Sequence, residues 1–338
     1  MSNKKLFANG ESESNFNSDS PRTLQKLGEL VRKQCHKINK TSNAGRKRSI
    51  FKILAPYLFV LPAFCIVFVF IIIAALHTFK LAFTNATLLS DGHFVGLDNF
   101  VRLFKDEYFV TALINSSLYV VCVVPFMVIL PLILANLVKG NSRIMGFFRT
   151  SFYMPVVMSA VVVGMIWTNL LDSSGLVNSV LKAAHIIDSS IPFLTNRWGI
   201  LFSSMFVTIW LGLGYYMVIY LTALANINKS LYEAADLDGA GAIRKFISVT
   251  MPGVRGTMWL ITMLSTISAF RVFNEVYVLT NGTAGPGGMD ITMSMLIKRE
   301  GTGIYARTGY ASAISLVVLV IVSTFLIIQR FVEKRGER

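Results

Sequence analysis

One polar stretch, residues 233–252, carries the side chains best suited to chemistry in this chain. It holds three acids, two basic residues and a Gly-Ala-Gly turn between two long apolar runs. Apolar residues keep helical spacing on either side of residues 239–241, which predicts two short amphipathic helices joined at that turn. A polar hairpin with an apolar face, placed between membrane spans, has nothing of its own to cover that face. The stretch therefore predicts a surface that binds a protein partner rather than a catalytic site.

Motifs for catalysis, nucleotide binding or metal binding do not occur in the sequence. There is no G-x-x-x-x-G-K-[ST] loop, so the chain is not expected to hydrolyse ATP alone. H-E-x-x-H, G-x-S-x-G and Cys/His metal clusters are also missing. Cys35, Cys65 and Cys122 suggest three unpaired thiols. We therefore expect no catalytic residue, no metal and no cofactor bound by this chain, and an enzyme embedded in the membrane is the weakest interpretation.

Composition points to an all-α polytopic membrane protein. Hydrophobic residues make up 54% of the chain and charged residues only 15%, against about 25% in a typical soluble domain. Apolar runs of about 20 residues, the length that crosses a bilayer, predict six spans. Polar residues 1–50 precede the transmembrane domain, residues 51–338. The spans are expected at about 54–77, 113–137, 150–171, 200–225, 257–279 and 308–330.

The positive charge predicts orientation rather than a nucleic-acid partner. Most of the 32 Lys and Arg residues fall in the tail, in residues 138–149 and 226–256, and at the C-terminus. Cytoplasmic loops are enriched in these residues, so both termini and the 226–256 loop are predicted to be cytoplasmic. The basic, largely disordered tail has two interpretations: an amphipathic helix on anionic lipid, or a topogenic charge only, which we favour.

The stretch at 233–252 closely resembles the EAA loop of permease subunits of bacterial ABC importers. The resemblance implies that the loop is a coupling helix seated in a groove of a separate ATPase subunit. Val249 stands where Ile is usual. The matching residues assigned to ATPase coupling are Glu233, Ala234, Ala235, Asp238, Gly239, Ala240, Phe246 and Pro252, and Thr250 also fits the pattern.

Further segments resemble the carbohydrate-uptake branch, of the maltose-transporter F and glycerol-phosphate A type. They are V-G-L-D-N-F at 95–100, F-R-T-S-F-Y-M-P-V-V-M-S at 148–159, G-L-V-N at 175–178, I-W-L-G at 209–212 and F-R-V-F-N-E-V-Y-V-L-T at 270–280. The family's usual Gly-Gly-Pro is replaced by N-G-T-A-G-P at 281–286, which puts that loop's contact with a binding protein in doubt.

The resemblance implies a fold, partners and a location. The fold is the six-helix type I importer permease (MetI-like) fold in the bacterial cytoplasmic membrane. The implied partners are a second homologous permease, a cytoplasmic ABC ATPase dimer that binds ATP and Mg²⁺, an extracytoplasmic solute-binding lipoprotein and a sugar.

A substrate path is expected along the fourth and fifth spans. The resemblance places one face of each on the sugar contacts of the maltose-type permease, and small residues there also let helices pack closely. Arg271 and Glu275 form either a local ion pair or a substrate contact. Tyr216 and Phe270 are further candidates for sugar contact. The expected path residues are Leu211, Gly212, Tyr215, Ser265, Ser268, Ala269, Arg271, Val272, Asn274 and Glu275.

Two alternatives stay open. The chain is a permease subunit of an ATP-driven sugar importer, or a self-sufficient secondary transporter or channel for a small polar solute. The second would favour inverted repeats and discontinuous helices at the membrane midplane, which the sequence does not suggest. Glycerol-phosphate or another polyol is an alternative substrate.

Overall fold

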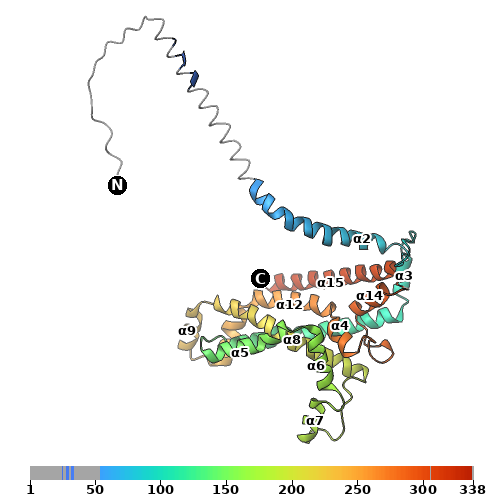
Figure 1. Ribbon diagram of the computed structural model, residues 1–338. Coiled ribbons are helices and arrows are strands. Elements are labelled where there is room, and N and C mark those ends of the chain that lie inside the picture. Colours follow the sequence, from blue (N-terminus) through green and yellow to red (C-terminus); the bar gives the residue numbers. More distant parts are fainter. Residues whose placement is uncertain (1–24, 26–27, 30–31, 34–53, 305, 337–338) are drawn as a thin grey trace. The chain divides into compact units, whose positions relative to one another are not determined.

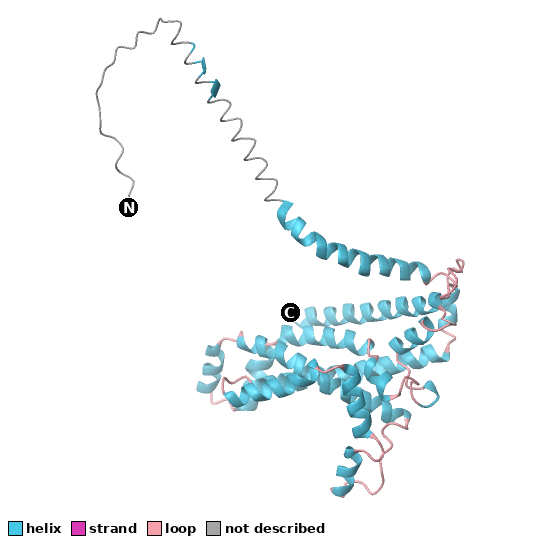
Figure 2. Cartoon of the chain, in the orientation of Figure 1, coloured by secondary structure: helices cyan, strands magenta, loops and turns pink. Residues whose placement is uncertain are grey.

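The computed structural model describes residues 25, 28–29, 32–33, 54–304 and 306–336, so most of the predictions for the 1–50 tail fall outside the described residues. Figures 1 and 2 show that the described chain is helical, and its β-structure is limited to the isolated bridges Thr84↔Phe94 and Thr87↔Ser90. The elements are η1 (Phe68–Ile73), α2 (Ala74–Leu81), α3 (Asp98–Leu103), α4 (Glu107–Leu137), α5 (Arg143–Tyr153), η2 (Met154–Val157), α6 (Ala160–Leu171), α7 (Leu176–Ala183), α8 (Arg197–Ala225), α9 (Lys229–Leu237), α10 (Ala242–Lys245), η3 (Phe246–Thr250), α11 (Met251–Gly253), α12 (Arg255–Phe270), α13 (Asn274–Leu279), η4 (Pro286–Gly288), α14 (Met293–Gly301) and α15 (Thr308–Gly336).

Six helices in this part of the chain are long and apolar enough to cross a membrane. They are Leu54–Leu81, Glu107–Leu137, Ala160–Ala183, Arg197–Ala225, Arg255–Leu279 and Thr308–Arg335. The expectation of six membrane helices and an all-α fold is therefore confirmed. The chain forms two compact units, Met1–Ala74 and Ala75–Arg338, and the first span begins in one and ends in the other.

Helix α4 is the centre of the second unit. It packs against α8, α12 and α14, and α15 packs against α12 and α14. The Asp106 carboxylate accepts a hydrogen bond from the Tyr108 N–H and so caps the start of α4. Pro125 and Pro131 lie inside this helix, where packing against its neighbours stabilises it. The Tyr220 hydroxyl of α8 donates to the Val128 carbonyl of α4 over 3.0 Å and joins the two helices.

The third span begins later than the expected residue 150. Residues 143–153 form the separate helix α5, which Ser142 caps by accepting from the Met145 N–H. A 3₁₀ turn at Met154–Val157 and an extended Met158 then interrupt the helix before α6 begins at Ala160. Pro155 lies in that turn, and proline favours the start of a helical segment rather than its interior.

The fifth span is discontinuous, which the sequence did not suggest. Helix α12 ends at Phe270, residues 271–273 are not helical, and α13 starts at Asn274. The break is fastened to a distant loop, because the Thr292 hydroxyl donates to the Val272 carbonyl over 3.0 Å. Our expectation of an unbroken fifth span was therefore wrong.

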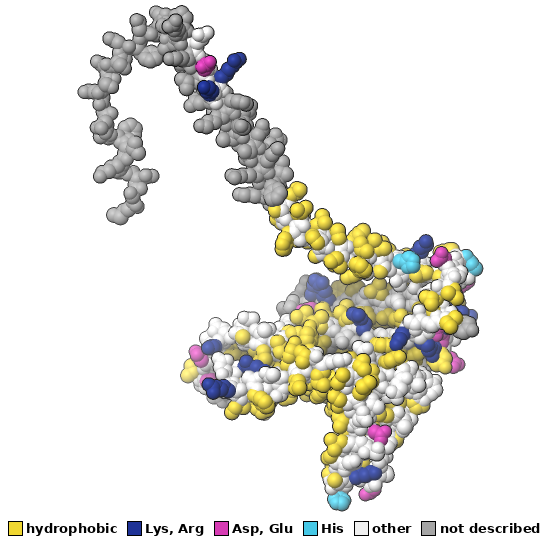
Figure 3. Space-filling view, in the orientation of Figure 1, with side chains coloured by type: hydrophobic (Ala, Val, Ile, Leu, Met, Phe, Trp, Pro, Cys, Tyr) yellow, Lys and Arg dark blue, Asp and Glu magenta, His cyan; other side chains and the backbone are white. Residues whose placement is uncertain are grey.

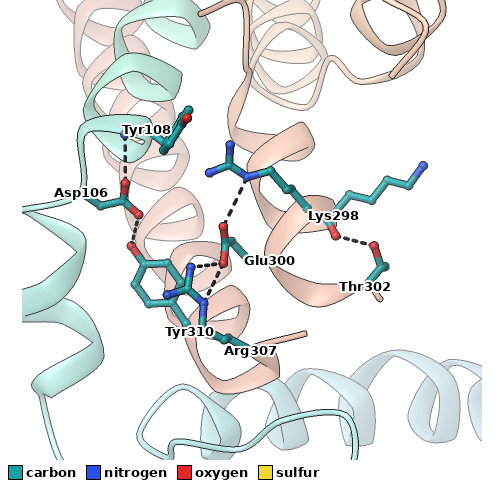
Figure 4. Close-up of polar contacts among 8 residues, drawn as sticks. Asp106, Tyr108, Lys298, Glu300, Thr302, Arg307 and Tyr310 are labelled. Atoms are coloured by element: carbon teal, nitrogen blue, oxygen red, sulfur yellow. Dashed lines mark hydrogen bonds and ion pairs between the residues drawn. The ribbon is translucent and has the colours of Figure 1, made fainter. Parts of the chain in front are cut away.

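A polar cluster ties three helices together at the end of the unit away from α9 (Figure 4). The Tyr310 hydroxyl of α15 donates to the Asp106 carboxylate over 2.6 Å. The Glu300 carboxylate of α14 accepts from Arg299 and pairs with Arg307. These contacts fix the starts of α4 and α15 against the end of α14. We call this the far end of the unit, and the end with α9 the hairpin end.

Candidate functional site

A helical hairpin projects at the hairpin end of the unit. Helix α9 (Lys229–Leu237) leads to a turn, and α10 with the π-helical segment η3 leads back. Asn228 caps α9 by accepting from the Ser230 N–H. Gly239 has φ +68, a left-handed conformation that glycine adopts at low cost. Two short helices joined at residues 239–241 are what the sequence pattern predicts.

Side-chain contacts hold the two arms of the hairpin together. The hydroxyl groups of Tyr232 and Thr250 lie 2.9 Å apart, and Thr250 is buried. Asp236 and Lys245 form an ion pair across the turn. The Lys139 ammonium group lies 4.8 Å from the centre of the Tyr232 ring, a cation–π contact with the segment that follows α4. The hairpin is thus a packed element whose two arms contact each other directly.

The outer surface of the hairpin combines charge with uncovered apolar side chains. Leu237 is 90% exposed and Ile243 is 78% exposed, and Leu231 and Ile247 are also exposed. Figure 3 shows acidic and basic side chains crowded at this end with hydrophobic atoms between them. Glu233, Ala234, Asp238 and Gly239 are exposed too, so most of the residues expected to couple to an ATPase are accessible. Pairing of exposed apolar side chains with mixed charge is suited to a protein partner.

Two cavities lie between α8 and the broken fifth span. The larger has a volume of about 430 Å³ and reaches α4 and the start of α6. The smaller, of about 360 Å³, lies along the break itself. They share the residues Thr208, Leu264, Ser268 and Glu275. The two cavities therefore adjoin at these four residues.

The structure brings all the expected path residues to these cavities. The larger cavity is lined by Leu211, Gly212, Tyr215, Ser265, Ser268, Ala269 and Glu275. The smaller one is lined by Ser268, Arg271, Val272, Asn274 and Glu275. Tyr216 also lines the larger cavity, and Thr208 lines both. Lining a cavity is a matter of position, and contact with a substrate stays a prediction.

Two of the contacts considered along with the path are not found in the structure. Phe270 does not face either cavity, because it is buried and packs against Phe325 of α15, with ring centres 5.3 Å apart. Arg271 and Glu275 form no ion pair among the described residues. Arg271 is itself one of the three non-helical residues 271–273 and Glu275 lies in the next helix, so the spacing of one turn on a continuous helix does not apply.

Asn115 and Ser116 are structural residues that the sequence analysis missed. The Asn115 amide donates to the carbonyls of Met289 and Ile291, over 2.8 and 2.9 Å, and the Ser116 hydroxyl accepts from the Met293 N–H. These bonds fasten the far-end loop to α4 across more than 170 residues of sequence. Two adjacent polar residues inside an apolar span are the signal that points to them.

Asp290 lies in this fastened loop and is fully buried. Neither carboxylate oxygen has a hydrogen-bond partner in the described part of the chain. Burial raises the pKa of Asp290 to about 7, and the nearby positive charge of Arg197 opposes that rise.

Comparison with known proteins identifies the family. The model of the family described as "Binding-protein-dependent transport system inner membrane component" matches residues 109–338. The lactose transport system permease protein LacF of Rhizobium radiobacter is 33% identical over 275 residues, covering 81% of this chain and 92% of LacF. The probable ABC transporter permease protein YurN of Bacillus subtilis is 34% identical over 289 residues, covering 84% and 97%.

Solved structures show the same fold. A bacterial ABC transporter involved in import of the acidic polysaccharide alginate has a chain that matches with a TM-score of 0.70 and 22% identity, over 86% of this chain and 99% of that chain. At that identity the likeness shows the fold alone. The family match covers the hairpin, both cavities and five of the six membrane helices. The chain therefore belongs to the family of binding-protein-dependent transport system inner membrane components, as a multi-pass membrane permease.

Proposed function

We propose that this chain is one permease subunit of an ATP-driven sugar importer, and that it couples a separate ATPase to a substrate path. Relatives named for transport of lactose, arabinooligosaccharides, and trehalose and maltose support the sugar class. The other parts of the machine are a second homologous permease, an ABC ATPase dimer that carries ATP and Mg²⁺, and an extracytoplasmic binding protein.

One observation carries the coupling proposal: the helices that line the cavities also lead into and out of the hairpin. Helix α8 runs unbroken from the cavity residues Thr208 and Tyr215 to Ala225, just before α9. Helix α12 starts at Arg255, just after the hairpin, and carries Ser265 and Ser268 into the cavity. About 15 residues of helix span roughly 20 Å. A displacement of the hairpin is therefore transmitted to the substrate path through two helices, α8 and α12.

The hairpin's base is packed so that its two ends move together. A Cβ added at Gly253 would lie 2.9 Å from the Ile227 Cδ1 atom, so the entry and exit segments are already in close contact. The Tyr232–Thr250 hydroxyl pair holds the arms one turn further out. Displacement of the hairpin by an ATPase would then tilt α8 and α12 together, and the path would open alternately to either side.

We further propose that the hairpin end and both termini are cytoplasmic. The hairpin carries Arg244 and Lys245, and the end of α15 carries Lys334 and Arg335 at the same end of the unit (Figure 1). Clusters of Lys and Arg next to spans favour the cytoplasmic side. The ATPase and its ATP are then on the same side as the exposed hairpin surface.

The break in the fifth span is the one feature that also suits a secondary transporter, where discontinuous helices bind substrate. The family match and the braced, exposed hairpin favour the ATP-driven importer, because a solo transporter has no partner for that surface. Glycerol-phosphate and other polyols remain alternative substrates on the importer proposal.

Reconstitution tests the proposal. The complete transporter is placed in liposomes with its ATPase and binding protein, and uptake of labelled lactose, maltose and arabinooligosaccharide is measured with and without ATP. We expect ATP-dependent uptake of a sugar and its loss in Glu233→Lys and Gly239→Pro, with sugar binding by the separate binding protein unchanged. Uptake by this chain alone, driven by an ion gradient, would refute the proposal.

A further inference from the structure

One acidic side chain stands where the two cavities meet. Glu275, in the first turn of α13, lines both the 430 Å³ and the 360 Å³ cavity. No other described residue forms an ion pair or a hydrogen bond with its carboxylate, although its own backbone N–H does. A partly buried carboxylate with free acceptor capacity, at the junction of two cavities, has no structural partner to explain it.

The hydroxyl groups around Glu275 are mostly committed as donors. The Thr208 hydroxyl donates to the Ser204 carbonyl over 2.9 Å, and the Ser265 hydroxyl donates to the Ile261 carbonyl over 2.7 Å. Each hydroxyl oxygen therefore keeps acceptor capacity, of which the Thr208 oxygen shares part with the Tyr119 hydroxyl 3.5 Å away. Together with the carboxylate, these groups make the wall of the larger cavity rich in acceptors. Such a wall is satisfied by a ligand that brings many O–H donors.

Arg271, the one basic residue that lines either cavity, is placed differently from Glu275. Arg271 lines only the smaller cavity, whereas Glu275 lines both. The larger cavity contains Glu275 as its one charged lining residue, and the aromatic ring of Tyr215 provides an apolar face. A sugar carboxylate would find a favourable charged partner at Arg271, whereas beyond the junction it would meet the like charge of Glu275 and no cation, with only neutral hydroxyl donors such as Tyr215 and Ser268.

We propose that Glu275 is a specificity-determining residue that accepts hydrogen bonds from hydroxyl groups of uncharged sugars and excludes sugars bearing carboxylates from the larger cavity. This rests on the proposed function of the cavities as the substrate path. The fold alone does not decide ligand charge, since the structurally similar transporter imports an acidic polysaccharide. In this chain the Glu275 side chain, at the junction of the two cavities, determines which ligand charge is accepted.

The test measures the potential at the junction without needing the natural substrate. Ser268, shared by both cavities, is replaced by cysteine in the complete transporter after Cys35, Cys65 and Cys122 are replaced by serine. Reaction rates are measured with two methanethiosulfonates of similar size, one carrying a trimethylammonium group and one a sulfonate. We expect the cationic reagent to react faster, and Glu275→Gln to lower the ratio of the two rates about tenfold, as loss of one charge several ångströms away implies.

Asp188→Asn is the matched control, because it neutralises an exposed carboxylate that lines neither cavity. It should leave the rate ratio unchanged. A ratio that Glu275→Gln does not move, or a Ser268→Cys thiol that neither reagent reaches, would overturn the inference. ATP-driven uptake in the same preparation would show separately that the proposed function still holds.

A second measurement uses a matched pair of sugars. Lactose is compared at equal concentration with lactobionate, in which oxidation of the reducing glucose to open-chain gluconate adds a carboxylate, for protection of the Ser268→Cys thiol. We expect stronger protection by lactose, and a smaller difference after Glu275→Gln. Equal or stronger protection by lactobionate with Glu275 present would overturn the proposal, and if neither sugar protects, the rate ratio decides.

Discussion

The hydroxyl groups of Tyr232 and Thr250 lie 2.9 Å apart and connect the two arms of the hairpin 18 residues apart in sequence. Tyr232 also lies under the Lys139 ammonium group, just beyond the end of α4. The Tyr232 side chain thus contacts both the returning arm of the hairpin and the segment that directly follows α4.

Tyr232→Phe removes the hydroxyl pair and keeps the ring. The buried Thr250 hydroxyl loses its partner, which we expect to cost about 1 kcal/mol of stability. The hairpin should then transmit force less well, so ATP hydrolysis should continue while uptake per ATP falls. Both are measured in the reconstituted transporter. Tyr153→Phe, at a tyrosine for which the described chain shows no hydroxyl partner, is the control. Equal coupling ratios in the two variants would contradict the prediction.

Alanine substitutions at Gly239 and Gly241 distinguish the effect of backbone conformation from the effect of steric space in the hairpin turn. An added Cβ would meet nothing within 4 Å at either position, but only Gly239 has a positive φ. Gly239→Ala should therefore strain the turn by about 1 kcal/mol and lower uptake, whereas Gly241→Ala should behave like the unsubstituted chain. Uptake and thermal unfolding of both variants check this. A stronger effect at Gly241 would show that the partner surface, not the turn geometry, sets the requirement.

The hairpin and the membrane helices were predictable because their signals are local. Periodic apolar residues around 239–241 indicate two short helices, and runs of about 20 apolar residues indicate spans. The start of the third span was misplaced because residues 152–158 are apolar, and hydropathy does not register the turn at Pro155. Length and composition alone do not separate a span from the surface helix that precedes it.

The candidate site was predictable as two helix faces but not as two cavities. Ser265, Ser268 and Tyr215 were placed by helical spacing, and they do face a common space. The break after Phe270 contains Val272, whose carbonyl accepts a hydrogen bond from Thr292 twenty residues further on, and a contact of that kind gives no local signal in the sequence. For the same reason the spacing of Arg271 and Glu275 suggested an ion pair that the broken helix does not form.

Gly212 and Gly214 lie two residues apart on α8, and we expect substitution by alanine to affect stability very differently at the two positions. A Cβ at Gly214 would lie 2.2 Å from the Phe152 carbonyl oxygen, a backbone atom that cannot move alone. A Cβ at Gly212 would lie 2.3 Å from the terminal carbon of Met127, a flexible side chain that can turn away. Gly214→Ala should cost about 1–3 kcal/mol and reduce the yield of folded permease, and Gly212→Ala should cost less than about 1 kcal/mol.

Thermal unfolding in detergent, followed by intrinsic fluorescence, compares these two variants. Gly212→Ala is also expected to shrink the larger cavity, since Gly212 and Met127 both line it. It should therefore affect uptake more than stability, and Gly214→Ala the reverse. Equal loss of stability in both would mean that Met127 has no room to move.

Asp290 should give the unfolding of this permease a pH dependence of definite sign. Burial raises the pKa of Asp290 to about 7, against about 4 in an unfolded chain. Between these values the folded state binds the proton and the unfolded state does not, so stability falls as pH rises from about 4 to about 7 and the loss is complete above that.

Asp290→Asn removes the titrating group. Melting temperatures measured from pH 5 to pH 8 should therefore decline more steeply with Asp290 than with Asn at this position. Asp188→Asn, at an exposed acid, serves as the control and should parallel the unsubstituted chain. Parallel profiles with and without Asp290 would show that its carboxyl group does not titrate in this window, and that the Arg197 charge outweighs the effect of burial.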